Sequence, residues 1–203
     1  LAYLLGSLIG SLVMGRFRGV DIRELGSGNA GGTNALRTQG WKFALGVVVI
    51  DVGKALVAAG VLPGIVLPGI GIDPAVSRDW LAVACAAAAV VGHVYPVWYE
   101  FRGGKGAATL VGAVAMLAPA ALLPVALVWL ACVMLTGFVG LATMLGTATL
   151  PVYFALVQPG SSALMVFGLA MAAFVIYTHR SNLARMRDGN ENRARRLWLL
   201  RPR

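Results

Sequence analysis

Long apolar runs alternate with short polar segments along the whole chain. A helix needs about 20 apolar residues to cross a bilayer, and apolar runs of roughly this length or shorter recur from end to end. The pattern predicts an all-α polytopic membrane protein, a single domain over residues 1–203 with seven transmembrane helices. The predicted helices cover about residues 1–15, 41–62, 80–95, 106–118, 120–135, 138–157 and 162–177, and the larger polar segments are 16–42, 71–79, 96–105 and 178–203.

The first and the middle spans carry two further expectations. The chain begins inside an apolar run without an initiator Met, so we expect residues 1–15 to be a span whose leading residues are missing, not a signal peptide. Pro119 and Pro124 interrupt the apolar sequence between residues 106 and 135. Because the two runs there are short, a re-entrant pair with five full spans elsewhere is the alternative.

Composition and charge narrow the class of protein. The chain is 59% hydrophobic and 12% charged, with a mean hydropathy of +0.80, which excludes an ordinary soluble domain. The net charge of +9 does not indicate nucleic acid, because fifteen of the seventeen basic residues lie in segments 16–42, 96–105 and 178–203. Basic residues beside membrane spans mark the cytoplasmic side, so we expect the N-terminus outside and the C-terminus in the cytoplasm.

The stretch "ELGSGNAGGTNALR", residues 24–37, contains the spacing G-x-G-x-x-G. No buried strand precedes it, which excludes a dinucleotide fold, and no Lys-Ser/Thr pair follows, which excludes a nucleoside triphosphate loop. Glycines still let successive N–H groups converge on an anion. We expect either a flexible loop or a phosphate site, the latter formed by Ser27, Gly28, Asn29, Gly31, Thr33, Asn34 and Arg37.

A second polar stretch, "GHVYPVWYEFRGGKGAAT", covers residues 92–109. Gly104 and Lys105 precede a predicted helix, whose N-terminus favours an anion, and His93 and Thr109 flank them. A lysine that snorkels to the interface is the alternative. The aromatic residues of the stretch are typical of an interfacial belt: Tyr95, Trp98, Tyr99 and Phe101.

The third stretch, "THRSNLARMRDGNENR", places His179 and Asn182 three residues apart, with Arg185 less than a turn further on. Residues three apart share a helical face, so both side chains can hydrogen-bond one anion or hydroxyl. The later arginines fit a positive-inside tail and are left out of the site: Arg193, Arg195, Arg196, Arg201 and Arg203. We predict that the three polar segments form one cationic site at the inner leaflet.

Asp51 and Lys54 lie three residues apart within an apolar run. A charge at the centre of a membrane helix costs about 2.5–3.5 kcal/mol on insertion scales, so these two should form an ion pair or line a polar cavity that supports the site. Cys85 and Cys132 stand alone in apolar sequence, and we expect neither a metal nor a cofactor.

Together, "GSGNAGGTNALR", "DVGK", "GHVYP…FRGGKGAAT" and "HRSNLARMRDGNE" resemble the bacterial membrane glycerol-3-phosphate acyltransferases that use acyl phosphate, the PlsY family. The resemblance implies acyl transfer to the 1-hydroxyl of sn-glycerol 3-phosphate, giving lysophosphatidate and inorganic phosphate, the first acylation of phospholipid synthesis. It implies a multi-pass protein of the bacterial cytoplasmic membrane whose site faces the cytoplasm, with no obligate protein partner. Lys105, His179 and Asn182 would face glycerol 3-phosphate, and His93 would be a proton acceptor or an orienting donor.

The chain departs at one position from the pattern that the resemblance implies, and other classes of protein remain as alternatives. Gly140 stands where the resemblance leads us to expect a serine, so a contact there, from Thr143 instead, is doubtful. The H-x-x-x-x-D motif of acyl-CoA-dependent acyltransferases is missing, because Trp98 lies five residues after His93. An anion transporter or a lipid-binding protein would be the rival, although no internal repeat supports the former.

Overall fold

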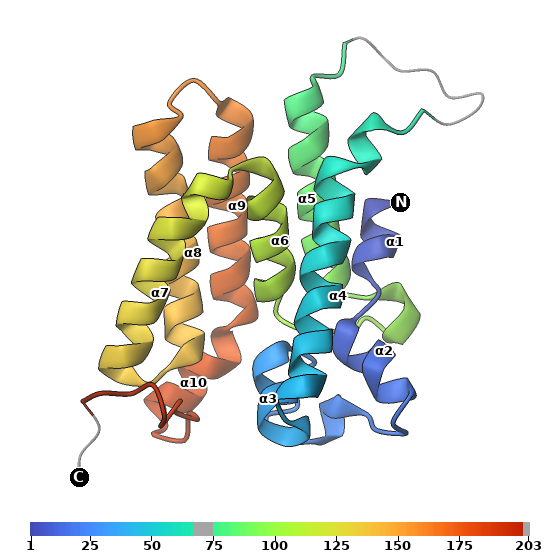
Figure 1. Cartoon of the computed structure of the whole chain (residues 1–203). Coiled ribbons are helices and arrows are strands. Elements are labelled where there is room, and N and C mark those ends of the chain that lie inside the picture. The colour runs from blue at the N-terminus through green and yellow to red at the C-terminus, as the bar shows by residue number, and fades with distance from the viewer. Residues whose placement is uncertain (67–74, 201–203) are drawn as a thin grey trace. The chain divides into compact units, whose positions relative to one another are not determined.

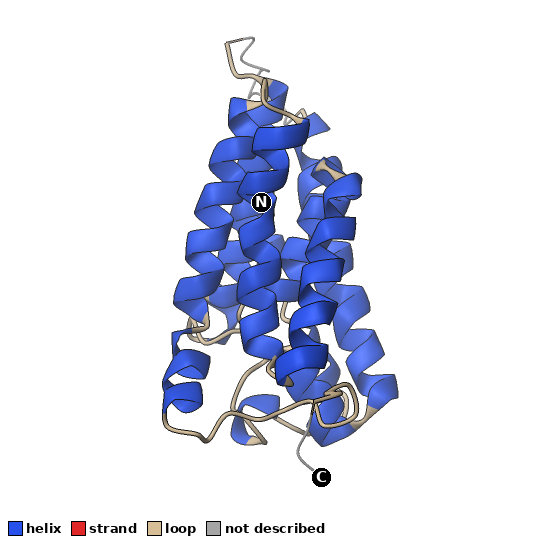
Figure 2. Cartoon of the chain, turned by 90° about the vertical axis from the view of Figure 1, so that its left-hand side faces the viewer, coloured by secondary structure: helices blue, strands red, loops and turns tan. Residues whose placement is uncertain are grey.

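The computed structural model of the protein describes residues 1–66 and 75–200, and these form helices and loops without a strand (Figure 2). Residues 71–74 of the predicted polar segment 71–79, as well as Arg201 and Arg203, therefore lie outside the described residues. The chain forms two compact units, Leu1–Ala118 and Pro119–Arg203, coloured blue to green and yellow-green to red in Figure 1. The single domain over residues 1–203 stays a prediction.

Unit 1 is organised around one long helix, α4 (Trp41–Gly60), which packs against α2, α3, α5 and α6. The other elements of the unit are α1 (Ala2–Gly6), α2 (Gly10–Arg16), η1 (Ile22–Glu24), α3 (Gly32–Gln39), η2 (Leu62–Gly64), α5 (Arg78–Val94), η3 (Val97–Tyr99) and α6 (Ala107–Leu117). Unit 2 is a row of helices in which α8 packs against both α7 and α9. Its elements are η4 (Pro119–Ala121), α7 (Leu122–Thr136), α8 (Val139–Val157), α9 (Ser162–Thr178) and α10 (Arg180–Arg187).

Four helical segments are long and apolar enough to cross a membrane, and a bent pair makes a fifth. The four are Trp41–Gly64, Arg78–Tyr99, Pro119–Thr136 and Val139–Val157, and the pair is α9 with α10, bent by 48°. Large apolar side chains on α4, such as Leu45 and Val49, are more than half exposed, as expected of a helix that faces lipid. The chain is an integral membrane protein, whereas seven spans and the orientation of the termini stay predictions.

The apolar run 1–15 forms two short helices instead of the continuous span that we expected. α1 ends at Gly6, α2 begins at Gly10, and Ile9 between them is extended, with φ −85° and ψ 116°. The break releases backbone groups from helical hydrogen bonds, and these groups need other partners in an apolar surrounding. Lys54 donates to the Leu8 carbonyl at 2.7 Å, and the Gly10 N–H donates to Asp51 at 3.0 Å. The charged pair of α4 thus replaces the missing helical bonds.

Small residues let α1 and α5 pack with their backbones in contact. A Cβ added at Gly6 would overlap the backbone of Ala89, and one added at Gly92 would overlap the Tyr3 carbonyl. Close approach of this kind is how membrane helices gain packing energy, since lipid tails are as apolar as their side chains. The α1–α5 contact holds the C-terminal end of α5, which carries His93, against the break in the first run.

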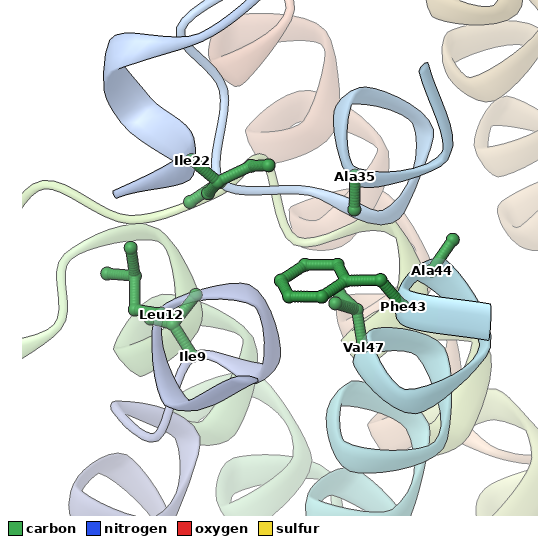
Figure 3. Close-up of a cluster of buried hydrophobic side chains, with 8 residues drawn as sticks. Ile9, Leu12, Ile22, Ala35, Phe43, Ala44 and Val47 are labelled. Atoms are coloured by element: carbon green, nitrogen blue, oxygen red, sulfur yellow. The ribbon is translucent and has the colours of Figure 1, made fainter. Parts of the chain in front are cut away.

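An apolar cluster lies where α2, α3 and α4 meet (Figure 3). The side chains of Ile22, Leu12 and Phe43 point toward one another there, with Phe43 fully buried. Ile22 lies two residues before the glycine-rich stretch, so the cluster fixes the approach to that loop. The buried members of the cluster are Ile9, Leu12, Ile22, Ala30, Ala35, Phe43, Ala44 and Val47.

The end of the described chain is fastened to the turn between α7 and α8. Arg193 lies over the rings of Phe138 and Trp198, at 4.3 and 4.1 Å from their centroids, and donates to the Thr136 carbonyl at 3.2 Å. Two cation–π contacts of this kind contribute about 0.5–1 kcal/mol each at an exposed site. Arg193 therefore has a structural role, in agreement with its exclusion from the site.

Candidate active site

The glycine-rich stretch forms a loop that leads into α3. Gly26 and Gly28 have φ values of +58° and +72°, which residues with a Cβ rarely adopt. α3 begins at Gly32 without a side-chain cap, so Thr33 lies in its first turn. Thr33 and Arg37 are four residues apart on α3, hence on one face, and both are exposed. The uncapped N–H groups of the first turn can bind phosphate, and Arg37 in the last turn of the same helix adds a positive charge.

Asn34 shapes this loop from within. Its buried side chain accepts from the Ser27 N–H at 3.0 Å and donates to the Leu25 and Ile22 carbonyls at 2.8 and 3.1 Å. These bonds use the amide of Asn34 on the protein backbone, so this residue holds the loop in shape, a role different from the direct phosphate contact that we predicted. Ser11 of α2 adds a further tie, donating to the Ala30 carbonyl at 2.8 Å.

Arg23 joins the glycine-rich loop to the second polar segment within unit 1. Its guanidinium donates to the carbonyls of Tyr99 and Arg102, both at 3.3 Å, and forms an ion pair with Asp21 at 2.7 Å. The hydrogen bond from Arg23 lowers the pKa of Asp21, and the same bond raises the pKa of Arg23. The structure thus brings two of the three predicted polar segments together.

A cluster of buried charged side chains lies next to the second polar segment, residues 96–105. The predicted pairing of Asp51 and Lys54 is confirmed, with 3.0 Å between Nζ and Oδ1. His93 of α5 joins them, its Nδ1 lying 2.9 Å from Lys54 Nζ and 3.3 Å from Asp51 Oδ1. All three side chains are almost wholly buried. The cluster supports the position of His93, a link that the spacing in the sequence did not reveal.

The Gly103–Gly106 loop packs directly on His93. The N–H of Gly103 donates to the Val94 carbonyl at 3.2 Å, and that of Gly104 donates to the His93 carbonyl at 3.1 Å. A Cβ added at Gly104 would overlap Nε2 of His93. Only glycine allows this approach, which explains the G-G-K-G composition. Lys105 follows at once and is half-buried.

Gly106 and Thr109 complete this segment. Gly106 is the residue before α6 and has φ +86°, so it too requires the freedom of glycine. Thr109 lies in the first turn of α6 and is fully buried, and its hydroxyl has no hydrogen-bond partner among the described residues. The site role of Thr109 stays a prediction.

In unit 2, His179 lies at the bend between α9 and α10. Its Nδ1 is 2.8 Å from the Val175 carbonyl, and because a carbonyl oxygen can only accept, Nδ1 carries a proton there. The Thr178 hydroxyl also donates to Val175, at 3.0 Å. When neutral, His179 therefore has its unprotonated nitrogen at Nε2.

Asn182 is held by Glu191, a residue that the sequence analysis did not select. Asn182 Nδ2 donates to Glu191 Oε1 at 2.8 Å, and Arg185 Nε donates to Glu191 Oε2 at 2.7 Å. The bond to Glu191 orients the Asn182 side chain and engages its amide nitrogen. The turn that returns the chain to α10 contains Gly189, with φ +73°. The sequence D-G-N-E could have indicated this turn, because Gly and Asn favour such turns.

Gly140 and Thr143 differ from the expectation of a small hydroxyl near the site. A Cβ added at Gly140 would lie 2.8 Å from Cγ of Asn182, so glycine leaves the room that the Asn182 side chain occupies. Thr143 donates to the Val139 carbonyl at 2.8 Å and accepts from Trp129 at 3.3 Å. Its hydroxyl is therefore engaged within α8 and toward α7.

The fold and these side chains define an integral membrane protein of helical units, with charged and amide side chains held at helix ends and glycine loops. In the described ranges, no group of three or more His, Cys, Asp or Glu residues could hold a metal ion.

Comparison with known proteins gives the family. A family model described as glycerol-3-phosphate acyltransferase matches residues 1–189. A glycerol-3-phosphate acyltransferase of Chlorobaculum parvum is 37% identical, with 95% of this chain and 93% of that protein covered. One of Chlorobaculum tepidum is 36% identical with the same coverage. The chain belongs to the glycerol-3-phosphate acyltransferase family.

Solved structures agree with this assignment. Crystal structures of PlsY (YgiH), an integral membrane glycerol 3-phosphate acyltransferase, match in two forms. Its glycerol 3-phosphate form has a TM-score of 0.80 and 35% identity, and its lysophosphatidic acid form a TM-score of 0.77 and 34% identity. Each match covers 95% of this chain and 91% of the other. The protein is an acyltransferase of the PlsY type.

Proposed function

We propose that this protein transfers a fatty acyl group from acyl phosphate to the 1-hydroxyl of sn-glycerol 3-phosphate. The hydroxyl oxygen forms a bond to the acyl carbonyl carbon, and the bond from that carbon to the phosphate oxygen breaks. Phosphate leaves with the electron pair, and the hydroxyl proton leaves with the products. The products are lysophosphatidate and inorganic phosphate.

The observation that carries the proposal is the pairing of two glycine loops in unit 1 by Arg23. One loop presents Arg37 and uncapped N–H groups at α3, and the other presents Lys105 after the Gly104–His93 contact. Such groups suit phosphate, which both substrates carry. The similar crystal structures are of a glycerol 3-phosphate form and a lysophosphatidic acid form, which supports the same acceptor and product here.

The hydrogen bonds of Thr178 and His179 bear on the choice between direct transfer and a covalent intermediate. Thr178 and His179 both donate to the Val175 carbonyl, so this adjacent pair is not a hydroxyl nucleophile with its base. Acyl phosphate is a mixed anhydride and needs no covalent activation by the enzyme. Holding two anionic substrates in line and stabilising the developing oxyanion are then the main contributions.

We assign roles by unit. In unit 1 the glycine-rich loop and the Gly103–Gly106 loop bind phosphoryl groups, with Asp51 and Lys54 in support. In unit 2 His179 and Asn182 contact glycerol 3-phosphate, with Arg185 supporting Asn182 through Glu191. The proposed phosphate-binding residues are Ser27, Gly28, Asn29, Gly31, Thr33, Arg37, Gly104, Lys105 and Thr109. The active site faces the cytoplasm from the bacterial cytoplasmic membrane, and both substrates are available on that side.

The test is an assay on the purified full chain in detergent with acyl phosphate and glycerol 3-phosphate. We expect one phosphate released for each lysophosphatidate formed, without coenzyme A. Acyl-CoA, offered in place of acyl phosphate, should give no product. Product from acyl-CoA alone would refute the proposed donor, and movement of glycerol 3-phosphate into vesicles without acylation would favour the transporter.

A further inference from the structure

Lys54 makes three polar contacts in the buried cluster, and two of them fix the direction of its hydrogen bonds. The Leu8 carbonyl at 2.7 Å and the Asp51 carboxylate at 3.0 Å are acceptors. The third contact is His93 Nδ1 at 2.9 Å. An ammonium has three donors and no acceptor, so the three contacts match the three protons of a charged lysine.

Charge balance favours the same arrangement. The Asp51 carboxylate is buried, so one compensating positive charge is expected beside it, on either Lys54 or His93. Lysine is the stronger base of the two side chains, which favours the proton on Lys54. Lys54 is also closer to Asp51 Oδ1, at 3.0 Å against 3.3 Å for His93. The proton therefore resides on Lys54, and His93 is neutral.

A neutral imidazole that accepts at Nδ1 carries its proton at Nε2. Nε2 is directed at Gly104, where a Cβ would overlap it, one residue before Lys105. The ring N–H of His93 thus points toward the Gly103–Gly106 loop. The backbone of His93 also holds this loop, because its carbonyl accepts a hydrogen bond from the Gly104 N–H.

We propose that the Asp51–Lys54 pair locks His93 in the Nε2–H tautomer, so that His93 donates a hydrogen bond to the phosphoryl ligand of the Gly103–Gly106 loop and is not the base of the reaction. Asp51 and Lys54 are then positioning residues that act through His93. The nature of the ligand rests on the proposed function, whereas the tautomer does not.

The tautomer is measured by nitrogen NMR on the full chain, labelled with ¹⁵N-histidine in detergent at neutral pH. The chain has two histidines, so a His179→Gln sample assigns His93 directly. We expect one protonated nitrogen, Nε2, and one unprotonated nitrogen, Nδ1. A protonated Nδ1, alone or together with Nε2, would overturn the proposal.

Removal of Lys54 tests the cause of the lock. In Lys54→Met the Asp51 carboxylate needs another donor, and His93 Nδ1 is the group already 3.3 Å away. We expect Nδ1 to become protonated. Lys42→Met is the matched control, because Lys42 lies exposed at the start of the same helix and should leave His93 unchanged. An unprotonated Nδ1 in Lys54→Met would contradict the role of the pair, and the wild-type spectrum tests the tautomer even where this variant does not fold.

Amide replacements distinguish a donor from a base. The amide of Gln reaches the region of Nε2 and can donate there, whereas Asn reaches only the region of Nδ1, and neither can act as a base. We expect His93→Gln to keep kcat within about tenfold of wild type, and His93→Asn and His93→Ala to lose about 10²-fold. An equal loss in all three would indicate a base and refute the proposal. If wild type transferred no acyl group, the proposed function would fail while the NMR result still decided the tautomer.

Discussion

His93 and His179 are both buried, yet their surroundings assign them opposite chemistry. His93 meets charged side chains, Asp51 and Lys54, from 42 and 39 residues away, and presents Nε2–H. His179 meets a backbone carbonyl four residues earlier in its own helix, that of Val175, and presents the unprotonated Nε2 when neutral. The identity of the neighbour at Nδ1 thus decides whether a histidine donates or accepts at its other nitrogen.

The largest expected effect is at Lys105, the charge beside the His93 contact. Lys105→Ala should lower kcat by about 10²–10³-fold, the usual cost of removing one group that stabilises developing negative charge. Steady-state phosphate release measures this. Lys42→Ala removes an exposed lysine from the same unit and should stay near wild type. Comparable rates in the two variants would show that Lys105 is not part of the site.

The next effect is on stability and concerns the charges around His93. Asp51→Ala leaves Lys54 as an unpaired buried charge and should lower the free energy of unfolding by about 3–5 kcal/mol. Lys54→Ala leaves Asp51 with only the less basic His93 to balance it and should also be destabilised. The double variant Asp51→Leu/Lys54→Met removes both charges and should be less destabilised than either single variant. Thermal unfolding in detergent compares them. Additive losses in the double variant would mean that the two side chains act independently.

Beside His179, the support of Asn182 by Glu191 should be worth less. Glu191→Ala frees the Asn182 amide and should lower kcat about tenfold, in line with about 1.4 kcal/mol for a charge-assisted hydrogen bond. Glu191→Gln can still accept from Asn182 and should recover part of this loss. The pair is compared by kcat at saturating glycerol 3-phosphate. Absence of any rescue by Gln would argue against an orienting role.

A smaller effect is expected at Gly140, against which Asn182 packs. Gly140→Ala places a methyl group 2.8 Å from Asn182 Cγ, so the amide must shift by a few tenths of an ångström. We expect kcat to fall a few-fold, about 0.5–1.5 kcal/mol for a side chain moved from its preferred rotamer. Gly160→Ala, with no atom within 4 Å of the added Cβ, is the control in the same unit. An unchanged rate in Gly140→Ala would show that the position of Asn182 is not critical.

The smallest effect concerns the partly exposed pair of Asp21 and Arg23. Its bond lowers the pKa of Asp21, so it stabilises the fold above the pKa of the unfolded carboxyl, about 3.9, and this contribution is lost as the pH falls through the folded pKa. Asp21→Asn should cost about 0.2–1 kcal/mol at pH 7. Thermal unfolding at several pH values should show the difference from wild type shrink as the pH falls below about 4. A constant difference would assign it to another cause.

Local spacing predicted those parts of the molecule whose partners are close in sequence. The Asp51–Lys54 ion pair followed from three-residue spacing in an apolar helix. The bonds from this pair to the first apolar run and to His93 join residues 39 to 46 positions apart. No local pattern encodes such partners.

The same reason explains the differences at single residues. The length of the apolar run predicted one helix over residues 1–15. That length carries no information on Asp51 and Lys54, which supply hydrogen-bond partners where the helix breaks. The composition of the loop placed Asn34 among ligands, although its amide holds the loop itself. Glu191 was not selected from the sequence, since only the turn at Gly189 brings it to Asn182.

Direct transfer from acyl phosphate is the central claim, and phosphate release with and without the acceptor tests it most directly. Purified protein is mixed rapidly with acyl phosphate alone, and phosphate and the intact mass of the protein are followed together. We predict no phosphate burst and no added acyl mass until glycerol 3-phosphate is supplied, and then one phosphate for each lysophosphatidate. A burst of one phosphate per protein without acceptor, with a matching acylated mass, would contradict the account.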